Sequence, residues 1–256
     1  PAPAGPAVPS LVGRAGEFAR LETALNEAAG GRNVRIMLLT GEPGLGKSRL
    51  LAELAQTVRR RGGSVVEGCA YEIEAGGRPF GAWIDALRRL NPLSVEESLS
   101  KELAPLLPEL TRSDVPETSR DRLFAAVGEL LALQALDGRP VLLLLDDAQY
   151  LDEGSVALLH YVARHARNLP LLIVLAGRTG EIAENDALSR ALRALRRELP
   201  MDDIELSPLD AENTARLLDH VAPDADAARV FAESGGNPLF ALEVARALQH
   251  RRDELP

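Results

Sequence analysis

"TGEPGLGKSRLL" (residues 40–51) combines three glycines with a single lysine that stands directly before a serine. Its residues 41–48 fit the pattern G-x-x-x-x-G-K-[ST] at every position. A continuous apolar run (34–40) precedes the pattern and an amphipathic segment follows it, as expected for a buried strand and a helix. We therefore predict a strand, a tight loop and a helix in that order.

The bare backbone of this loop suits a polyphosphate. Gly41, Gly44 and Gly46 let successive N–H groups turn inward as a concave anion site, and the helix N-terminus adds partial positive charge. We expect Lys47, a solvent-facing loop charge, to reach the β- and γ-phosphates, and the Ser48 hydroxyl to be a Mg²⁺ ligand. The alternative is a glycine turn with a chance lysine. The predicted nucleotide-contacting residues of the loop are Gly41, Pro43, Gly44, Leu45, Gly46, Lys47, Ser48 and Arg49.

A second apolar run, VLLLLDD (141–147), ends in two carboxylates. An acidic residue at the end of another buried strand is what a phosphate loop needs to complete a nucleotide site. We predict that Asp146 holds Mg²⁺ through water and that Asp147 orients or deprotonates the attacking water. The alternative is that the two aspartates form a solvated turn.

Strand and helix patterns alternate along most of the chain. Continuously apolar strands indicate a parallel sheet with helices on both faces, so we predict an α/β, three-layer αβα P-loop NTPase fold. We expect residues 1–10 to be a disordered leader, 11–207 a nucleotide-binding domain and 208–256 a helical lid subdomain. The strands are expected at 34–40, 64–70, 141–147, 171–178 and 201–206, and the helices after residue 48, around 83–90, at 119–136 with Ser119 as N-cap, after 155 and at 185–199.

Composition limits the function classes. The net charge of −9 disfavours a domain built to grip phosphate backbones, so this chain is expected not to bind nucleic acid; RRR (59–61) and RALRRE (193–198) are typical of solvated helix faces. The apolar runs are too short to cross a bilayer, and the single Cys69, expected to be a small buried strand residue, fits a cytoplasmic location. The histidines show no metal spacing with Cys69, so no metal beyond Mg²⁺ is predicted.

Four further stretches carry a family resemblance. They are LVGRAGEFARLETAL (11–25), LDDAQYLD (145–152), LIVLAGR (172–178) and SGGNPLFALEVARAL (234–248). Together with the phosphate loop they resemble the ATPase domain of the signal-transduction ATPases with numerous domains (STAND), which are close to AAA+ proteins. The nearest likeness is to large LuxR-type bacterial transcriptional regulators, and it implies a five-stranded sheet with the sensor strand between the strands of the phosphate loop and of Asp146.

The resemblance also implies roles for residues outside the phosphate loop. Val12, Gly13 and Arg14 would lie beside the adenine and ribose, Pro238 would cap the base from the lid, and Arg178 would sense the γ-phosphate or the nucleotide state. The alternatives are an exposed arginine in an N-terminal arm at 14, a simple helix break at 238 and a surface charge at 178.

The sequence also departs from the family pattern. Ala15 stands where glutamate is common, and either Glu17 fills part of that role or the role is absent. In RALRRE, Arg193, Arg196 or Arg197 would be an arginine finger, or this is a solvated helix face. Phe80 and Trp83 are expected to be core anchors.

The function implied is an ATP/ADP-binding regulatory switch with slow, Mg²⁺-dependent hydrolysis that controls self-association of a transcriptional regulator. The chain would be a fragment, with DNA-binding domains beyond its C-terminus. The alternative is an AAA+ motor ATPase that loads or remodels DNA, and a binding module without catalysis is a weaker third reading. A complete arginine finger and fast turnover would favour the motor, whereas an acidic domain without a basic groove favours the switch.

Overall fold

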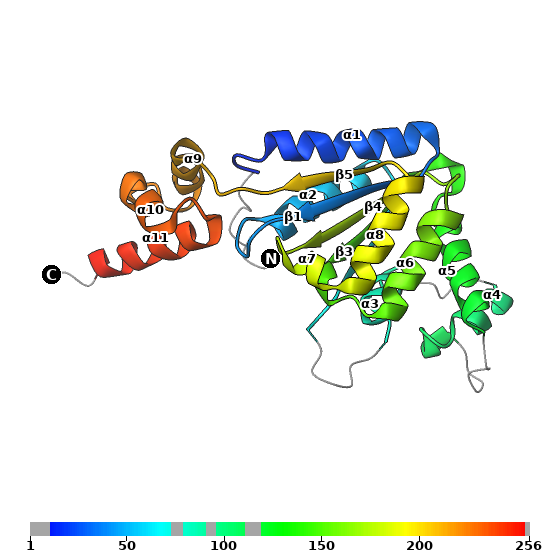
Figure 1. Cartoon of the computed structure of the whole chain (residues 1–256). Helices are drawn as coiled ribbons and strands as arrows, with labels where there is room; N and C mark the ends of the chain where they lie inside the picture. The colour runs from blue at the N-terminus through cyan, green and yellow to red at the C-terminus, as the bar shows by residue number, and fades with distance from the viewer. Residues whose placement is uncertain (1–10, 73–78, 91–95, 111–118, 254–256) are drawn as a thin grey trace.

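Five parallel strands form one sheet in the computed structural model, which describes residues 11–72, 79–90, 96–110 and 119–253. The strand order is β2-β3-β4-β1-β5, so β4 lies between the strand before the phosphate loop and the strand that ends in the two aspartates. The predicted fold class, the strands and the position of the 171–178 strand between the other two are thereby confirmed (Figure 1). The strands are β1 (Arg35–Thr40), β2 (Ser64–Cys69), β3 (Val141–Asp146), β4 (Leu171–Gly177) and β5 (Met201–Glu205).

The strands are apolar on both sides because helices cover both faces. Side chains of successive strand residues point to opposite faces, so on β1 Ile36 and Leu38 join one buried cluster while Met37 and Leu39 join the other. One face carries α1 (Ala15–Gly31) and α2 (Lys47–Arg60). The opposite face carries α3 (Gly81–Arg88), α4 (Glu97–Leu103), α5 (Arg120–Gln134), α6 (Glu153–His165) and α8 (Asp186–Glu198), with the short α7 (Glu181–Glu184) beside α8.

Several local predictions can be compared with these elements. Ser119 caps α5 as predicted, since its hydroxyl accepts a hydrogen bond from Arg122 N at 3.4 Å. Trp83 is fully buried and its indole N–H donates to Ser155 O at 3.1 Å, which confirms it as a core anchor. Phe80 packs edge-on against Phe124 with ring centroids 6.2 Å apart. The expected leader (1–10) lies outside the described residues.

The sequence reading missed helices α1 and α4, and also the four-residue α7. α1 buries Leu21 and Leu25 against the sheet, but its other core contacts come from the small residues Ala24 and Ala28, which weaken the apolar period. α4 has seven residues, too few for a period to show.

Helices alone follow β5 in the described part of the chain, as predicted. They are α9 (Ala211–Val221), α10 (Ala227–Ser234) and α11 (Pro238–Asp253), and they lie beyond one edge of the αβα layers (Figure 1). These C-terminal helices share a small buried cluster of their own. Within the ranges given above, no helix is long and apolar enough to cross a membrane.

Candidate functional site

The loop after β1 turns back on itself through glycines. Gly44 has φ +85° and Gly46 has φ +95°, a left-handed conformation that side chains disfavour. A Cβ at Gly44 would also lie 2.6 Å from Asn237 Oδ1, so this glycine leaves room for the C-terminal helices. α2 begins immediately afterwards at Lys47, which directs its N-terminus at the loop.

The prediction that Lys47 faces the solvent is wrong. The side chain is buried and not solvent-facing, because its ammonium folds back to donate hydrogen bonds to Gly41 O (2.6 Å) and Glu42 O (3.2 Å). Burial lowers the pKa of Lys47, while the nearby Asp146 and Asp147 act in the opposite direction and raise it. The lysine therefore carries a partly desolvated charge within reach of two carboxylates.

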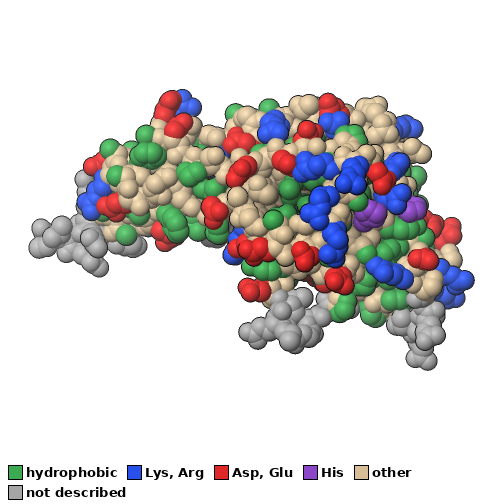
Figure 2. All heavy atoms as spheres, in the orientation of Figure 1, with side chains coloured by type: hydrophobic (Ala, Val, Ile, Leu, Met, Phe, Trp, Pro, Cys, Tyr) green, Lys and Arg blue, Asp and Glu red, His purple; other side chains and the backbone are tan. Residues whose placement is uncertain are grey.

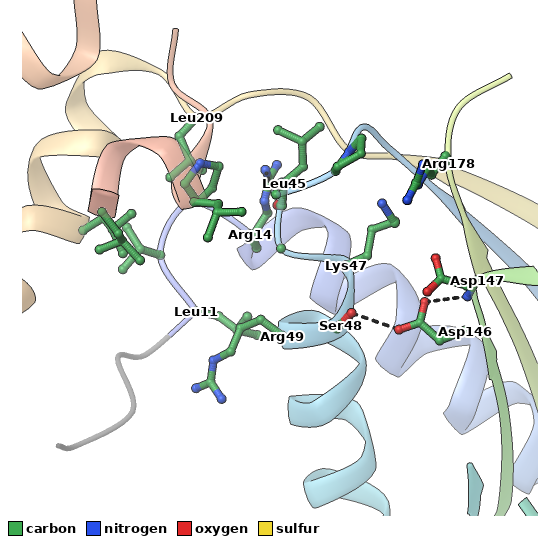
Figure 3. Close-up of a pocket in the computed structure, with 18 residues that line it drawn as sticks. Leu11, Arg14, Leu45, Lys47, Ser48, Arg49, Asp146, Asp147, Arg178 and Leu209 are labelled. Atoms are coloured by element: carbon green, nitrogen blue, oxygen red, sulfur yellow. Dashed lines mark hydrogen bonds between the residues drawn. The ribbon is translucent and has the colours of Figure 1, made fainter. Parts of the chain in front are cut away.

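Asp146 ends β3 directly opposite the start of α2. The Ser48 hydroxyl donates to Asp146 Oδ2 at 2.9 Å, and Asp147 N donates to Asp146 Oδ1 at 2.9 Å (Figure 3). Hydroxyl and carboxylate oxygens are the hard ligands that Mg²⁺ prefers, so the donor set of Ser48 and Asp146 fits this ion. Within the described ranges, no group of three or more His, Cys, Asp or Glu side chains is placed to hold a metal.

Asp147 has a left-handed backbone, with φ +51° and ψ +42°. This conformation is uncommon for residues with a side chain. It turns the carboxylate toward Gln149, whose Nε2 donates to Oδ1 at 3.2 Å, and toward Cys69, whose thiol lies 3.8 Å from Oδ2. Burial, followed by the charges of Asp147 and Asp146, raises the pKa of Cys69 to about 11, so the thiol stays protonated and can donate. Cys69 lies in a strand as predicted, but it is half-buried and not buried, because it is the last residue of β2.

Arg178 follows the last residue of β4 and lines the same cavity as the two aspartates (Figure 3). Its guanidinium pairs with Glu181 at 3.1 Å, and its side chain keeps 39% of its surface exposed. The hydrogen bond and charge of Glu181 raise its pKa further above neutral pH. A permanently charged, partly exposed arginine at this edge can contact a terminal phosphate.

Arg14 is buried and not an exposed arm residue. Its guanidinium donates to Leu45 O (3.1 Å) in the phosphate loop and to Ser207 O (2.7 Å) after β5, and it pairs with Glu17 at 3.0 Å. Gly13 beside it has φ +67°. Arg14 thus ties the N-terminal segment to the loop, and Glu17 is its acidic partner.

The C-terminal helices contact the phosphate loop directly. Asn237 Nδ2 donates to Pro43 O at 2.9 Å, and Leu239 N donates to Gly44 O at 3.3 Å. Pro238 is the first residue of α11 and also lines the cavity, so it begins a helix and faces the site at the same time.

These elements enclose a cavity of about 490 Å³, within the range of small-molecule sites. Of the predicted site residues, Gly13 and Gly41 alone are not among those that line it. The sequence reading missed the leucines of the lining outside the phosphate loop, because nothing separates these leucines from core leucines in the sequence. The missed residues are Leu11, Leu209, Leu217, Leu239 and Leu242.

None of the three candidate arginine-finger residues lines this cavity. Arg196 pairs with Asp203 through contacts of 2.8 and 2.9 Å. Arg193 and Arg197 are exposed on α8. The structure is therefore consistent with a solvated helix face here.

A glycine-rich loop, a lysine at the helix start and a serine bonded to a strand-end aspartate define a P-loop nucleotide-binding protein. The chain belongs to the AAA ATPase domain family, whose model matches residues 10–175. No curated protein sequence matches the chain significantly.

Solved structures agree with this assignment at the level of the fold. Cdc6p of Pyrobaculum aerophilum superposes with a TM-score of 0.61 at 18% identity, over 97% of this chain and 65% of that one. The Aeropyrum pernix ORC1 protein in complex with DNA gives 0.56 at 19%, over 95% and 62%. The replication initiator DnaA, bound to AMPPCP and single-stranded DNA, gives 0.54 at 13%, over 95% and 63%. The chain thus spans less than two thirds of the length of these proteins.

Proposed function

We propose that this chain is an ATP/ADP-binding regulatory switch with slow, Mg²⁺-dependent ATP hydrolysis. The observation that carries the proposal is the cavity itself. One wall holds the phosphate loop and the carboxylates, and the other is made by helices that hydrogen-bond to that same loop through Asn237 and Leu239. A ligand that changes the conformation of the phosphate loop must therefore also change the contacts between the loop and these helices. A switch requires such a coupling.

In this proposal the phosphate loop binds the nucleotide and Lys47 exchanges its loop carbonyl partners for the β- and γ-phosphates. Ser48 and Asp146 would hold Mg²⁺, which neutralises phosphate charge when bound. Asp147 orients or deprotonates the attacking water, and Arg178 contacts the γ-phosphate. The residue types and positions support these roles.

Val12, Arg14 and Pro238 line the same cavity, and we propose that the base and ribose bind beside them. The apolar lining here, including Leu209 and Leu217, favours a stacked purine over a charged group. We expect adenine to be preferred to guanine. The check is competition: GTP that displaces bound ADP as well as ATP does would contradict the preference.

The C-terminal helices act as a lid in this account. With ADP they rest on the loop in a closed state, ATP releases them and permits self-association, and hydrolysis restores the closed state. A switch has to keep the γ-phosphate bound for long enough to signal, and rapid hydrolysis would shorten that time. We therefore expect a turnover number below the ~1–10³ s⁻¹ of typical enzymes. We further propose that the chain acts in the cytoplasm as part of a longer STAND-type transcriptional regulator, whose other domains bind DNA.

Two measurements on the wild-type chain test this proposal. Calorimetry should show binding of MgADP and MgATP, and the absence of any binding at millimolar nucleotide would overturn it. Light scattering after chromatography should show a larger species with a non-hydrolysable ATP analogue than with ADP. A size that follows steady turnover and not nucleotide identity would favour a motor.

The second candidate is an AAA+ ATPase that acts on DNA. It is favoured by the structural neighbours, since the Aeropyrum pernix ORC1 and DnaA structures both contain DNA. The net charge of −9 favours the switch. Arginines gather over α6 and α8 (Figure 2), but several of them are paired with carboxylates. Arg164, for example, pairs with Glu198 at 3.0 Å. Fluorescence anisotropy at physiological salt separates the two, because sequence-independent DNA binding tighter than ~10⁻⁶ M would favour the motor.

A further inference from the structure

Gln149 lies in the 3-10 turn η4 (Ala148–Tyr150) after β3, and its side chain is buried with 7% of the residue exposed. Its Oε1 accepts a hydrogen bond from Arg178 N at 3.3 Å, and its Nε2 donates to Asp147 Oδ1 at 3.2 Å. A backbone N–H can only donate and a carboxylate can only accept, so the two partners together fix the orientation of the amide. One side chain thus joins the ends of β3 and β4.

Neighbouring residues leave space for the Gln149 side-chain amide and fix the backbone of Gln149. A Cβ at Gly177 would lie 2.7 Å from Gln149 Oε1 and 2.5 Å from Ile182 Cδ1, so a side chain there would displace the amide. Asn185 Nδ2 donates to Gln149 O at 3.0 Å and to Leu151 O at 2.9 Å, which fixes the turn itself. The link from Arg178 N through the Gln149 amide to Asp147, called the bridge below, therefore consists of protein groups only.

Gln149 makes the shorter of the two side-chain hydrogen bonds that the Asp147 carboxylate accepts in the described part of the chain, at 3.2 Å. The other is the Cys69 thiol at 3.8 Å, and a thiol is a weak donor. An amide donor on an ionised carboxylate is a charge-assisted bond, about twice as strong as a neutral one. The side chain of Arg178 lines the nucleotide cavity, while its backbone is bonded to the same amide. A displacement of the end of β4 would therefore move the Gln149 amide, and the amide would move the Asp147 carboxylate.

We propose that Gln149 is a positioning residue for ATP hydrolysis, which sets the orientation of the Asp147 carboxylate according to the position of Arg178. The inference rests on the proposed ATPase function and adds a residue that touches neither nucleotide nor metal. It connects the residue that handles the attacking water to the residue that contacts the γ-phosphate.

Two substitutions separate the two bonds of the bridge. Gln149→Glu keeps an acceptor for Arg178 N and places a repelling carboxylate against Asp147, whereas Gln149→Leu removes both bonds at similar volume. Each variant should lower kcat by about 10- to 100-fold, the cost of a misplaced catalytic group. The Kd for MgADP should stay within about twofold of wild type, because Gln149 is not part of the phosphate loop.

Hydrogen exchange of the Arg178 backbone amide gives a readout that does not depend on hydrolysis. Protection should persist in Gln149→Glu and be lost in Gln149→Leu. Ser155→Ala is the matched control, since it removes the hydroxyl that donates to Asp152 Oδ2 at 2.5 Å and touches neither Asp147 nor Arg178. It should lower Tm and leave kcat and the exchange of Arg178 unchanged.

Three results would overturn the inference. They are wild-type hydrolysis in Gln149→Leu, a Kd for MgADP that weakens in proportion to kcat, or unchanged protection of the Arg178 amide in Gln149→Leu. A wild-type chain that binds no nucleotide would instead refute the proposed function, and the exchange measurement would still decide whether the bridge exists.

Discussion

The two walls of the cavity differ in how much buried apolar packing supports them. On the sheet wall, Lys47, Asp146 and Asp147 extend from elements packed into two large clusters of buried side chains, one on each face of the sheet. On the other wall, the C-terminal helices share a buried cluster of five residues, three of them alanine: Leu218, Ala222, Val230, Ala241 and Ala245. Leu239 and Phe240 at the start of α11 remain about half exposed.

In the proposed switch, this difference lets one cavity combine a fixed catalytic wall with a wall that moves. Segments with few buried apolar contacts open locally at lower free energy than the core does. The lid meets the phosphate loop through the hydrogen bonds of Asn237 and Leu239, each worth about 0.5–1.5 kcal/mol. The sheet wall should therefore determine binding and hydrolysis, and the lid wall should determine how long the nucleotide stays.

The largest expected effect is on the sheet wall at Asp147. Asp147→Asn should reduce hydrolysis by about 10³-fold, because it removes the group that handles the attacking water. Nucleotide affinity should be retained, whereas Asp146→Asn should weaken the Mg²⁺ dependence of binding. Phosphate release and calorimetry on both variants measure this, with the exposed Asp202→Asn as control. Hydrolysis at the wild-type rate in Asp147→Asn would exclude it as the catalytic base.

Lys47→Met should weaken MgADP binding by about 10²-fold, the cost of removing one partner of a desolvated charge contact. The variant also leaves Gly41 O without its donor, while Glu42 O keeps the hydrogen bond from Leu45 N, so a loss of stability of about 1 kcal/mol is expected as well. Thermal unfolding without nucleotide separates the two effects. Lys101→Met is the control, because Lys101 pairs with Glu97 on the exposed surface of α4. Undiminished affinity in Lys47→Met would contradict the phosphate role.

On the lid wall, Asn237→Asp should speed ADP dissociation by about 5- to 10-fold, the equivalent of one hydrogen bond. The substitution keeps the oxygen that accepts from Leu239 N and Phe240 N, and removes the donor to Pro43 O. Stopped-flow release of a fluorescent ADP measures the rate. Asp226→Asn, at the N-cap of α10 in the same lid, should leave it unchanged. If both variants release ADP at the wild-type rate, the bond to the loop does not retain the nucleotide.

The smallest expected effect is at Cys69. Cys69→Ala should lower kcat by about two- to threefold, because a single weak thiol contact to Asp147 is lost. With a pKa of about 11 the thiol is largely protonated at neutral pH, so its alkylation should be slow and should accelerate as pH rises toward that value. The pH dependence of iodoacetamide labelling measures this. Rapid labelling at neutral pH would contradict the buried environment of Cys69.

The sequence was sufficient for features that depend on local pattern. Continuous apolar runs predicted the parallel strands, and the spacing of Gly41, Gly46, Lys47 and Ser48 predicted a loop that now lines a cavity opposite Asp146. It was insufficient for features that depend on what the fold brings together. The inward fold of Lys47 onto Gly41 O and Glu42 O depends on how the loop turns, which the residue types alone do not specify. The link from Gln149 to Arg178 depends on β3 and β4 lying side by side in the sheet.

The helices also include features that the sequence alone could not predict. α1 was missed because alanines supply part of its buried face, and the leucines of the lid could not be assigned to the cavity because buried leucines look alike in a sequence. The hydrogen bonds of Asn237 and Leu239 to the phosphate loop join residues more than 190 positions apart in the sequence. Such contacts are set by tertiary packing.

The central claim is that ADP and ATP hold the lid differently against a fixed sheet wall. Spin labels at Arg190→Cys on α8 and Asp219→Cys on α9, both exposed, in a Cys69→Ala background would report the distance between the two walls. The account predicts one narrow distance distribution with MgADP and a longer or broader one with a non-hydrolysable MgATP analogue. Identical distributions with the two nucleotides, both bound at saturation, would contradict it.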